Sequence, residues 1–342
     1  MNLYKRFVLA LLMVCFTGMA AFALTATGTK PSGVTDAEWQ DLLDELNKEI
    51  EKIDDKPENL IRSFADASVF ASHGATQRAY GEYKRFAFTI GAMAGMRLPG
   101  SPFSLMNTSE IGDTLEKDGD IKAGINIQMI NAQFGLNTSS FLLEGLYLGV
   151  RFGYFSLNAI DDLTFKTLHI GLVGNYQIIK GRKPSGALYW RGLTVGTGFL
   201  FQKTTLDYNY TLDTITEGIV ALEPKLDFAM AVTTFTIPLE INTSVQLLWV
   251  LNLSLGAGVD IAFGKNDVSI GMDSKAYNVN IPSNTGSITI SGGGAMSPTI
   301  LNPKLMFNLG FKFGAVVIDV PITYYISKTA GISAGITLGI VY

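Results

Sequence analysis

The sequence predicts an all-β protein, a transmembrane antiparallel β-barrel of about ten strands that follows an α-helical N-terminal segment. Three observations predict this class. The chain opens with an export signal, residues from Phe86 onward alternate between bulky apolar and small or polar types, and no later run of roughly 18 apolar residues could form a spanning helix. Because only helices and closed barrels satisfy backbone polar groups in lipid, these observations together favour a barrel.

Residues 1–23 have the pattern of a secretory signal peptide. Basic residues precede an apolar run from Phe7, and the run ends on small residues at Ala21 and Ala23. The pattern predicts cleavage after Ala23 and, with a lipid-facing barrel, a location in the bacterial outer membrane. The single cysteine, Cys15, leaves with the signal, so no disulfide or thiolate site is expected.

The composition gives no sign of a nucleic-acid partner. The formal net charge is −4 and charged residues make up 16% of the chain, while the mean hydropathy is +0.26. A basic surface is the electrostatic footprint of nucleic-acid binding, and it is missing from this balance. The partners we expect are outer-membrane lipid and the barrel-assembly machinery.

Residues 24–83 are predicted to be a helical periplasmic or plug segment. Thr35 and Glu38 form a capping box in front of an amphipathic helix over 36–55, which carries acids on its polar face. Pro57 interrupts this helix, and the small apolar residues after it suit a narrow space. We expect part of 57–83 to plug the barrel, with these candidate residues: Leu60, Phe64, Phe70, His73 and Arg78.

Residues 84–342 are predicted to form the barrel. The period of two gives strands at about 86–97, 121–135, 141–157, 164–179, 188–208, 225–241, 246–264, 300–313, 316–326 and 330–342. Roughly eight to fourteen strands remain compatible with the pattern. Short connections alternate with long ones at 98–120, 209–224 and 265–299, which indicates outer loops and places the terminal Tyr342 at the periplasmic rim.

Three places break the alternation. The phase changes near Ile130 and near Thr233, which indicates either bulges or a wrong register. Pro321 falls in the middle of a strand and suggests a further bulge, because proline removes a ladder donor.

The inward face of the predicted strands is rich in glycine and carries several charges. The glycines either relieve crowding in a narrow barrel or make room for the plug; they are Gly145, Gly149, Gly153, Gly192, Gly196, Gly198, Gly256 and Gly258. The lumen-facing candidates are Arg97, Lys122, Arg151, Asp260, Lys304, Lys312 and Asp319. One interpretation is that these residues form internal salt bridges, and Lys312 and Asp319 are placed to form one of them. The other is that the basic residues select an anion. The acidic helix over 36–55 could neutralise the basic ones instead.

Catalysis has little support in the sequence. The only histidines are His73, in the plug segment, and His169, on the lumen face of a strand. Metalloprotease, nucleophile-elbow and phosphate-loop motifs do not occur. We therefore expect no enzyme, no cofactor and no metal site.

The stretch "NLIRSFADASVFASHGA" before the first strand, together with the aromatic C-terminus, resembles the long-chain fatty acid transporter family of outer-membrane proteins. That family has a larger barrel, typically of fourteen strands, and an Asn-Pro-Ala motif where this chain has "KPENL". The resemblance implies passive uptake of hydrophobic molecules and identifies no ligand residues.

The function expected from these features is passive passage of small hydrophobic or anionic molecules through a lumen that an N-terminal plug gates. The alternative is a non-conducting barrel that binds a partner through its long outer loops. Removing the plug separates the two, because only a channel would then open.

Overall fold

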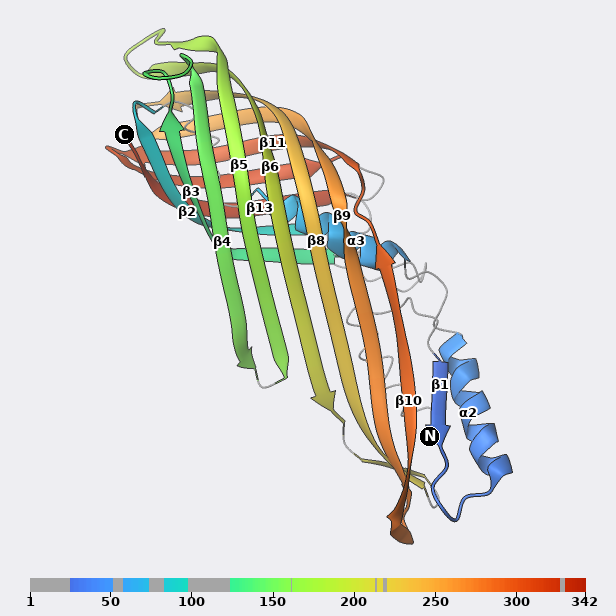
Figure 1. Cartoon of the computed structure of the whole chain (residues 1–342). Coiled ribbons are helices and arrows are strands. Elements are labelled where there is room, and N and C mark those ends of the chain that lie inside the picture. Colours follow the sequence, from blue (N-terminus) through green and yellow to red (C-terminus); the bar gives the residue numbers. More distant parts are fainter. Residues whose placement is uncertain are drawn as a thin grey trace.

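A computed structural model describes residues 25–51, 58–73, 83–97, 124–160, 162–212, 214–217, 220–326 and 330–342. These residues fold into one closed barrel with two helices (Figure 1). Within these residues, ten strands form a ring in the order β9-β11-β12-β13-β2-β3-β4-β5-β6-β8, which closes by the pairing of β8 with β9. Their bounds are β2 Phe86–Arg97, β3 Gly124–Asn137, β4 Leu146–Ile160, β5 Leu163–Arg182, β6 Leu188–Thr211, β8 Val220–Leu247, β9 Leu251–Asn278, β11 Leu301–Phe313, β12 Val316–Tyr325 and β13 Gly331–Val341. The predicted fold class is confirmed.

The outer face of the barrel is an apolar belt. In β4 the side chains of Phe152 and Val150 are 58% and 51% exposed, whereas Arg151 between them is only 8% exposed. Because successive side chains of a strand point to opposite faces, Arg151 lies in the lumen and its neighbours point outward. Exposed apolar side chains recur around the ring, and bulky groups placed this way indicate a surface that faces lipid.

The short turns gather at one end of the barrel, here called the C-terminal rim. Residues 138–145, 183–187, 248–250 and 314–315 connect strands there. The chain ends at the same rim, where the backbone N–H of Tyr342 donates to the carbonyl of Phe86 (2.9 Å). In barrels of this kind the short turns face the periplasm.

The opposite end is extended by strands rather than loops. Strands β8 and β9 continue past the apolar belt, and β10 (Ile281–Met296) pairs with the upper half of β9. Two short strands complete the sheet, β1 (Thr25–Thr29) beside β10 and β7 (Ile215–Glu217) beside β8. The expectation of long loops over 209–224 and 265–299 is therefore wrong for most of both segments, because cross-strand pairs hold them in the sheet.

Helix α2 (Asp36–Glu51) packs on this extended sheet, at the far end from the C-terminus (Figure 1). The predicted capping box is confirmed, since Thr35 N–H donates to the Glu38 carboxylate (3.0 Å) and Glu38 N–H donates to the Thr35 hydroxyl (3.3 Å). The hydrogen bond from the Thr35 hydroxyl holds the pKa of Glu38 below its usual value. The buried stripe of α2 joins an apolar core with the lumen-side residues of β8, β9 and β10; its members include Trp39, Leu43, Leu46, Leu222, Met272 and Ile290.

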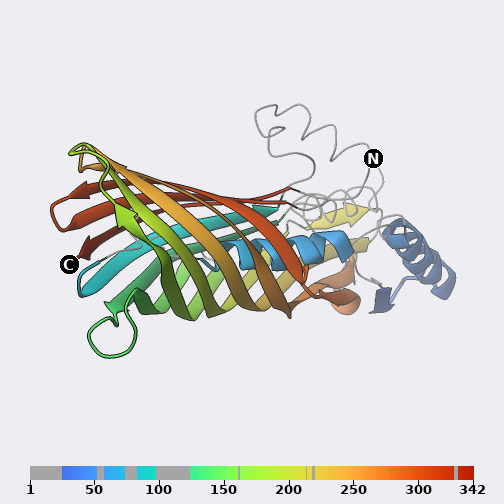
Figure 2. The same ribbon diagram turned by 90° about the horizontal axis from the view of Figure 1, so that it is seen from above.

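Helix α3 (Glu58–Ala71) runs inside the barrel between the two ends (Figure 2). Its residues from Ala65 to Ala71 are buried all round, as expected of a helix that walls surround on every side. A Cβ at Gly95 or Gly124 would overlap the backbone of α3, so these glycines let the helix lie directly against the wall. The glycines that seat the helix are thus not those expected from the strand pattern, because the helix leans on β2 and β3.

The three irregularities have different causes. At Ile130 the predicted bulge is present, because Met129 and Ile130 both point outward and the β2–β3 register shifts beside them. Near Thr233 the register of β8 is unbroken, and the lumen-facing residues change there from apolar to polar. The strand pairs of Pro321 also keep their register on both sides, so the bulge predicted there is wrong.

The placement of α2 makes a testable prediction. Asp41 lies exposed on α2 and Lys183 lies exposed in a short turn at the C-terminal rim. In whole cells, a membrane-impermeant maleimide should label Asp41→Cys and leave Lys183→Cys unlabelled, each in a Cys15→Ser background. The reverse labelling would show that the barrel has the opposite orientation.

Candidate functional site

A buried cluster of charged and polar side chains lies where α3 ends, and we call it the lumen cluster: His73, Glu240, Asp260, Lys304 and Tyr325. The Lys304 ammonium donates to Asp260 Oδ1 (2.5 Å) and Glu240 Oε1 (2.6 Å). His73 Nε2 lies 2.8 Å from Asp260 Oδ2. Asp260 and Lys304 are 0% and 1% exposed, so the charges neutralise one another away from water.

The strand register explains how the cluster assembles. Glu240 of β8, Gly258 of β9 and Lys304 of β11 form one cross-strand row. Since Gly258 in the middle has no side chain, Lys304 can reach across it to Glu240. Asp260 stands two residues further along β9 on the same face, within reach of the same ammonium.

The donor atoms of His73, Glu240 and Asp260 lie within 4.8 Å of one another, a spacing that could hold a metal ion. Lys304 Nζ lies 3.0 Å from His73 Nε2 and contacts both carboxylates. The ammonium therefore takes the position that a cation would need, and a divalent ion there would meet a like charge.

Two further contacts fix the end of α3. Arg151 Nη1 donates to the carbonyl of His73 (2.9 Å), and its Nε donates to Gln133 Oε1 (2.6 Å). The ring of Phe70 stacks on Tyr325 at 3.9 Å between centroids, and the Tyr325 hydroxyl donates to Asp260 Oδ2 (3.1 Å). The end of the helix is thus bound to β4, β9, β11 and β12 together.

Polar contacts also hold the body of α3. Asp66 forms an ion pair with Arg97 and accepts from the backbone N–H of Thr299 (2.6 Å). The hydroxyls of Ser68 and Thr234 lie 3.2 Å apart. These contacts join α3 to β2, to β8 and to the segment before β11.

Side chains fill the lumen beside the helix. Gln128 of β3 donates to Gln202 of β6 (2.5 Å), and Asn126 donates to Thr204 (3.1 Å) on the same pair of strands. Strands β3 and β6 are not neighbours in the ring, so these bonds cross the interior. Together with α3 these side chains occupy the lumen at mid-height.

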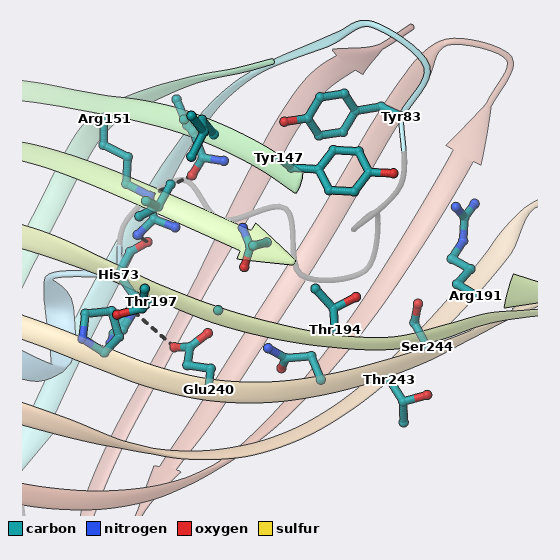
Figure 3. Close-up of a pocket in the computed structure, with 18 of the residues that line it drawn as sticks. His73, Tyr83, Tyr147, Arg151, Arg191, Thr194, Thr197, Glu240, Thr243 and Ser244 are labelled. Atoms are coloured by element: carbon teal, nitrogen blue, oxygen red, sulfur yellow. Dashed lines mark hydrogen bonds and ion pairs between the residues drawn. The ribbon is translucent and has the colours of Figure 1, made fainter. Parts of the chain in front are cut away.

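A cavity of about 70 Å³ lies between the lumen cluster and the C-terminal rim (Figure 3). His73, Arg151 and Glu240 border its inner end. Nearer the rim it is bordered by Arg191 and by Tyr83 and Tyr147, whose rings lie 4.9 Å apart. Burial raises the pKa of Tyr83, so its phenol stays protonated. The space is large enough for several water molecules, on the side of α3 that faces the rim.

The structure brings most of the predicted lumen residues to the interior. Arg97, Arg151, Asp260, Lys304, Lys312 and Asp319 lie on the lumen face, and Lys122 lies outside the described residues. Asp319 accepts from Asn308 (2.6 Å), and the described residues contain no ion pair between Lys312 and Asp319. Of the plug candidates, Phe64, Phe70 and His73 lie in or directly after α3; the Leu60 side chain and Arg78 are outside the description.

Sequence reasoning missed three residues of the site. Glu240 belongs to the uniform even-numbered lumen face of β8, which the apparent change of phase at Thr233 concealed. Tyr325 and Asp66 gave no sequence signal, because an aromatic near a strand end and an acid in a helix are common. Among the described side chains, no acid of α2 forms an ion pair with a lumen cation, and Asp36 pairs with Lys30.

The closed ring, the apolar belt and the filled lumen define a transmembrane β-barrel of the bacterial outer-membrane class. Among the described residues, no helix has the length and apolar character to cross a membrane. The Lsa36-like family model matches residues 19–341, so the chain belongs to the Lsa36-like family. No functionally curated protein matches the sequence.

Solved outer-membrane structures match most of the chain's length, with low TM-scores. They include the translocator domain of autotransporter NalP from Neisseria meningitidis (TM-score 0.33, 10% identity, 82% of this chain and 100% of that chain). The toluene transporter TbuX from Ralstonia pickettii gives 0.28 at 10% identity over 84% and 98%. LpxR from Salmonella typhimurium gives 0.25 at 10% over 74% and 100%.

The lumen cluster predicts a strong dependence of stability on Lys304. Lys304→Met leaves two buried carboxylates without their cation, which should destabilise the folded barrel by about 3–5 kcal/mol. Heat-modifiable gel migration measures this as a lower unfolding temperature. Lys203→Met removes an exposed lysine of β6 and serves as the control. Equal unfolding temperatures for both variants would contradict a structural role for the cluster.

Proposed function

We propose that the protein is an outer-membrane channel for small hydrophobic or anionic molecules, and that α3 closes its lumen. One observation carries the proposal: the ring of strands closes by β8–β9 pairing alone, while α3 lies inside it as a separate element. Since α3 is not part of the hydrogen-bonded sheet, it can move without breaking the backbone hydrogen bonds between strands that the lipid environment requires.

The contacts of α3 suit a gate that can be released. The ion pairs and hydrogen bonds of Asp66, Ser68 and His73 can re-form with water once the helix moves. The small side chains of Ala65, Ala67 and Ala71 limit the apolar surface exposed on departure, which comes mainly from Ile61, Val69 and Phe70. The contacts of α3 and its position inside the ring therefore both support a gating role.

The lumen walls fit the two solute types that the proposal names. Toward the extended end the inward side chains are apolar, among them Leu226, Met230, Val232, Val268 and Ile270. Toward the C-terminal rim they are polar and basic, including Arg151 and Arg191. An apolar molecule with an anionic end would meet a matching wall at each level, which also fits the resemblance to fatty acid transporters.

A second candidate is a closed barrel that binds a partner at its extended end. The observation that favours it is the folded platform of β9, β10, β1 and α2, which replaces the loop expected over 265–299. A rigid platform presents a fixed surface and loses less conformational entropy on binding than a loop would.

The proposal also names two partners of the barrel, outer-membrane lipid and the barrel-assembly machinery. The apolar belt contacts outer-membrane lipid, and the terminal strand β13, which ends beside Tyr342, is the segment that the assembly machinery would recognise.

Liposome swelling tests the gate. Asp66→Ala removes the contacts to Arg97 and Thr299, so solute entry should rise several-fold over the parent protein. Adding Ser68→Cys with Thr234→Cys, whose hydroxyls lie 3.2 Å apart, should return entry to the parent level when oxidised. Reduction of the disulfide should restore the raised solute entry of Asp66→Ala. All variants carry Cys15→Ser, and Ser68→Cys alone is the matched control.

A barrel that lacks residues 58–73 separates the two candidates. A channel should admit solute freely in this form, provided that gel migration shows a folded barrel. A folded barrel that still excludes solute would reject the channel and leave partner binding.

A further inference from the structure

We propose that the outer face of the barrel, at the edge of the apolar belt, holds a binding site for the phosphate group of an anionic membrane lipid. We call it the border site and define it by Lys166, Lys203, Thr233 and Lys265. These residues lie on β5, β6, β8 and β9, which are successive strands of the ring (Figure 1). The inference goes beyond the proposed function, because lipid binding needs no conduction.

The apolar belt ends at a row of phenylalanines. Phe201 of β6, Phe235 of β8 and Phe263 of β9 are cross-strand partners. The rings of Phe201 and Phe235 lie 5.0 Å apart between centroids, and Phe235 and Phe263 are 36% and 50% exposed. Aromatic side chains form a girdle where a barrel leaves the hydrocarbon core, so this row marks the border of the belt toward the extended end.

The outward side chains of β9 show the border most clearly. They are apolar as far as Phe263, and the next ones along the strand are Lys265, Asp267 and Ser269. The change from apolar to charged thus takes one step of the alternating series, roughly 7 Å along the strand. A side chain this close to the edge of the hydrocarbon core lies at the level of the lipid headgroups.

Two lysines flank one hydroxyl in the row beyond the phenylalanines. Lys203 of β6 and Lys265 of β9 are the cross-strand partners of Thr233 on β8, one on each side. Neighbouring strands lie about 4.8 Å apart, so the backbones of the two lysines are separated by about 10 Å. Both lysines are exposed, and their flexible four-carbon stems can bring both ammonium groups to one phosphate over Thr233.

A third lysine lies one row farther from the belt. Lys166 of β5 is the cross-strand partner of Thr205, which follows Lys203 on the outward face of β6. Lys166 is exposed and its neighbour Thr167 is buried, so Lys166 points outward. Diagonal neighbours across two strands lie about 7 Å apart, which places Lys166 within reach of the same phosphate as Lys203.

Acids lie no closer to the belt than Lys166. Asp267 shares the row of Lys166, and Asp207 and Asp227 follow in later rows. Lys265 forms an ion pair with Asp267, and the two side chains are 60% and 53% exposed. Among the described residues no other acid pairs with a lysine of the border site. Because an ion pair this exposed is weak, a lipid phosphate can replace Asp267 as the partner of Lys265.

The position of the border site assigns the phosphate to a lipid and not to a free solute. The acyl chains of a bound lipid would lie on the phenylalanine row and the belt, while its phosphate meets the lysines. Beyond the lysines the same face has an open hollow of about 620 Å³, bordered by residues that include Thr205, Ala231, Asp267 and Gly293. The hollow leaves room for a headgroup that extends past the phosphate, and Asp267 can accept from its hydroxyls.

Native mass spectrometry of the folded, detergent-solubilised protein tests the site. The probe is dimyristoyl phosphatidylglycerol. Phosphatidylcholine with the same chains is its zwitterionic match, and glycerophosphoglycerol is the headgroup without chains. Phosphatidylglycerol should bind at least about tenfold more tightly than either. Lys203→Gln with Lys265→Gln should lower its affinity at least about tenfold, and added salt should lower it in the parent.

The matched control is Lys225→Gln with Lys275→Gln. These lysines are exposed on the same face of β8 and β9, and Lys275 lies roughly 33 Å farther along β9 than Lys265. The control removes the same charge, and its affinity for phosphatidylglycerol should equal that of the parent. All four lysines are exposed, so the unfolding temperature in lipid-free detergent should stay unchanged, and Lys203→Gln alone keeps the test valid if the double variant fails to fold.

Equal affinity for phosphatidylglycerol in the parent and the Lys203 and Lys265 variants would overturn the border site, and so would an equal loss in the control. Phosphatidylcholine that binds as tightly as phosphatidylglycerol would overturn the recognition of an anionic headgroup. Glycerophosphoglycerol that binds as tightly as the whole lipid would overturn the assignment to a membrane lipid.

Discussion

The closed backbone ladder is the constraint on which the rest of this structure depends. Lipid offers no partner for a peptide N–H or carbonyl, so β9 must be paired on both edges within the belt. On one edge it pairs with β8 along its whole length. Its other edge pairs with β11 in the belt and with β10 beyond it. Ring closure fixes which side chains face inward, and the interior then has to be filled or wetted.

The interior of the barrel is filled in two different ways along its length. Toward the extended end, α2, the start of α3 and the strands share one apolar core, as in a soluble protein. At mid-height the partners become polar, and a lysine, two carboxylates and a histidine meet at the end of α3. A buried ion cluster adds little to stability, but it fixes where the helix ends. A packed helix thus occupies the lumen, and charged contacts hold its end in place.

Much of the barrel could be predicted from the sequence, because strand alternation is a local signal. The bounds of β2 follow directly from the pattern between Phe86 and Arg97. The upper half of β9 could not be predicted, since outside the membrane its outward face is polar, as Asp267 and Lys275 show. The path of the N-terminal segment could not be predicted either, because no local pattern indicates whether α2 packs at the C-terminal rim or at the extended end.

The candidate site shows the same limit. Asp260 and Lys304 were recognised as lumen residues from alternation, yet their meeting depends on Gly258 lying between two neighbouring strands. The register between two strands cannot be predicted from the sequence of either strand alone. Glu240 and Tyr325 could therefore be assigned to the lumen cluster only from the fold.

The central claim is that α3 occupies the lumen of the membrane-embedded protein. Hydrogen exchange of the backbone amides of residues 61–71, measured by mass spectrometry in lipid nanodiscs, tests it most directly. The amides of α3 should exchange as slowly as those of the neighbouring strands β2 and β3. Exchange within seconds, as in an unfolded chain, would show that the helix does not fill the barrel.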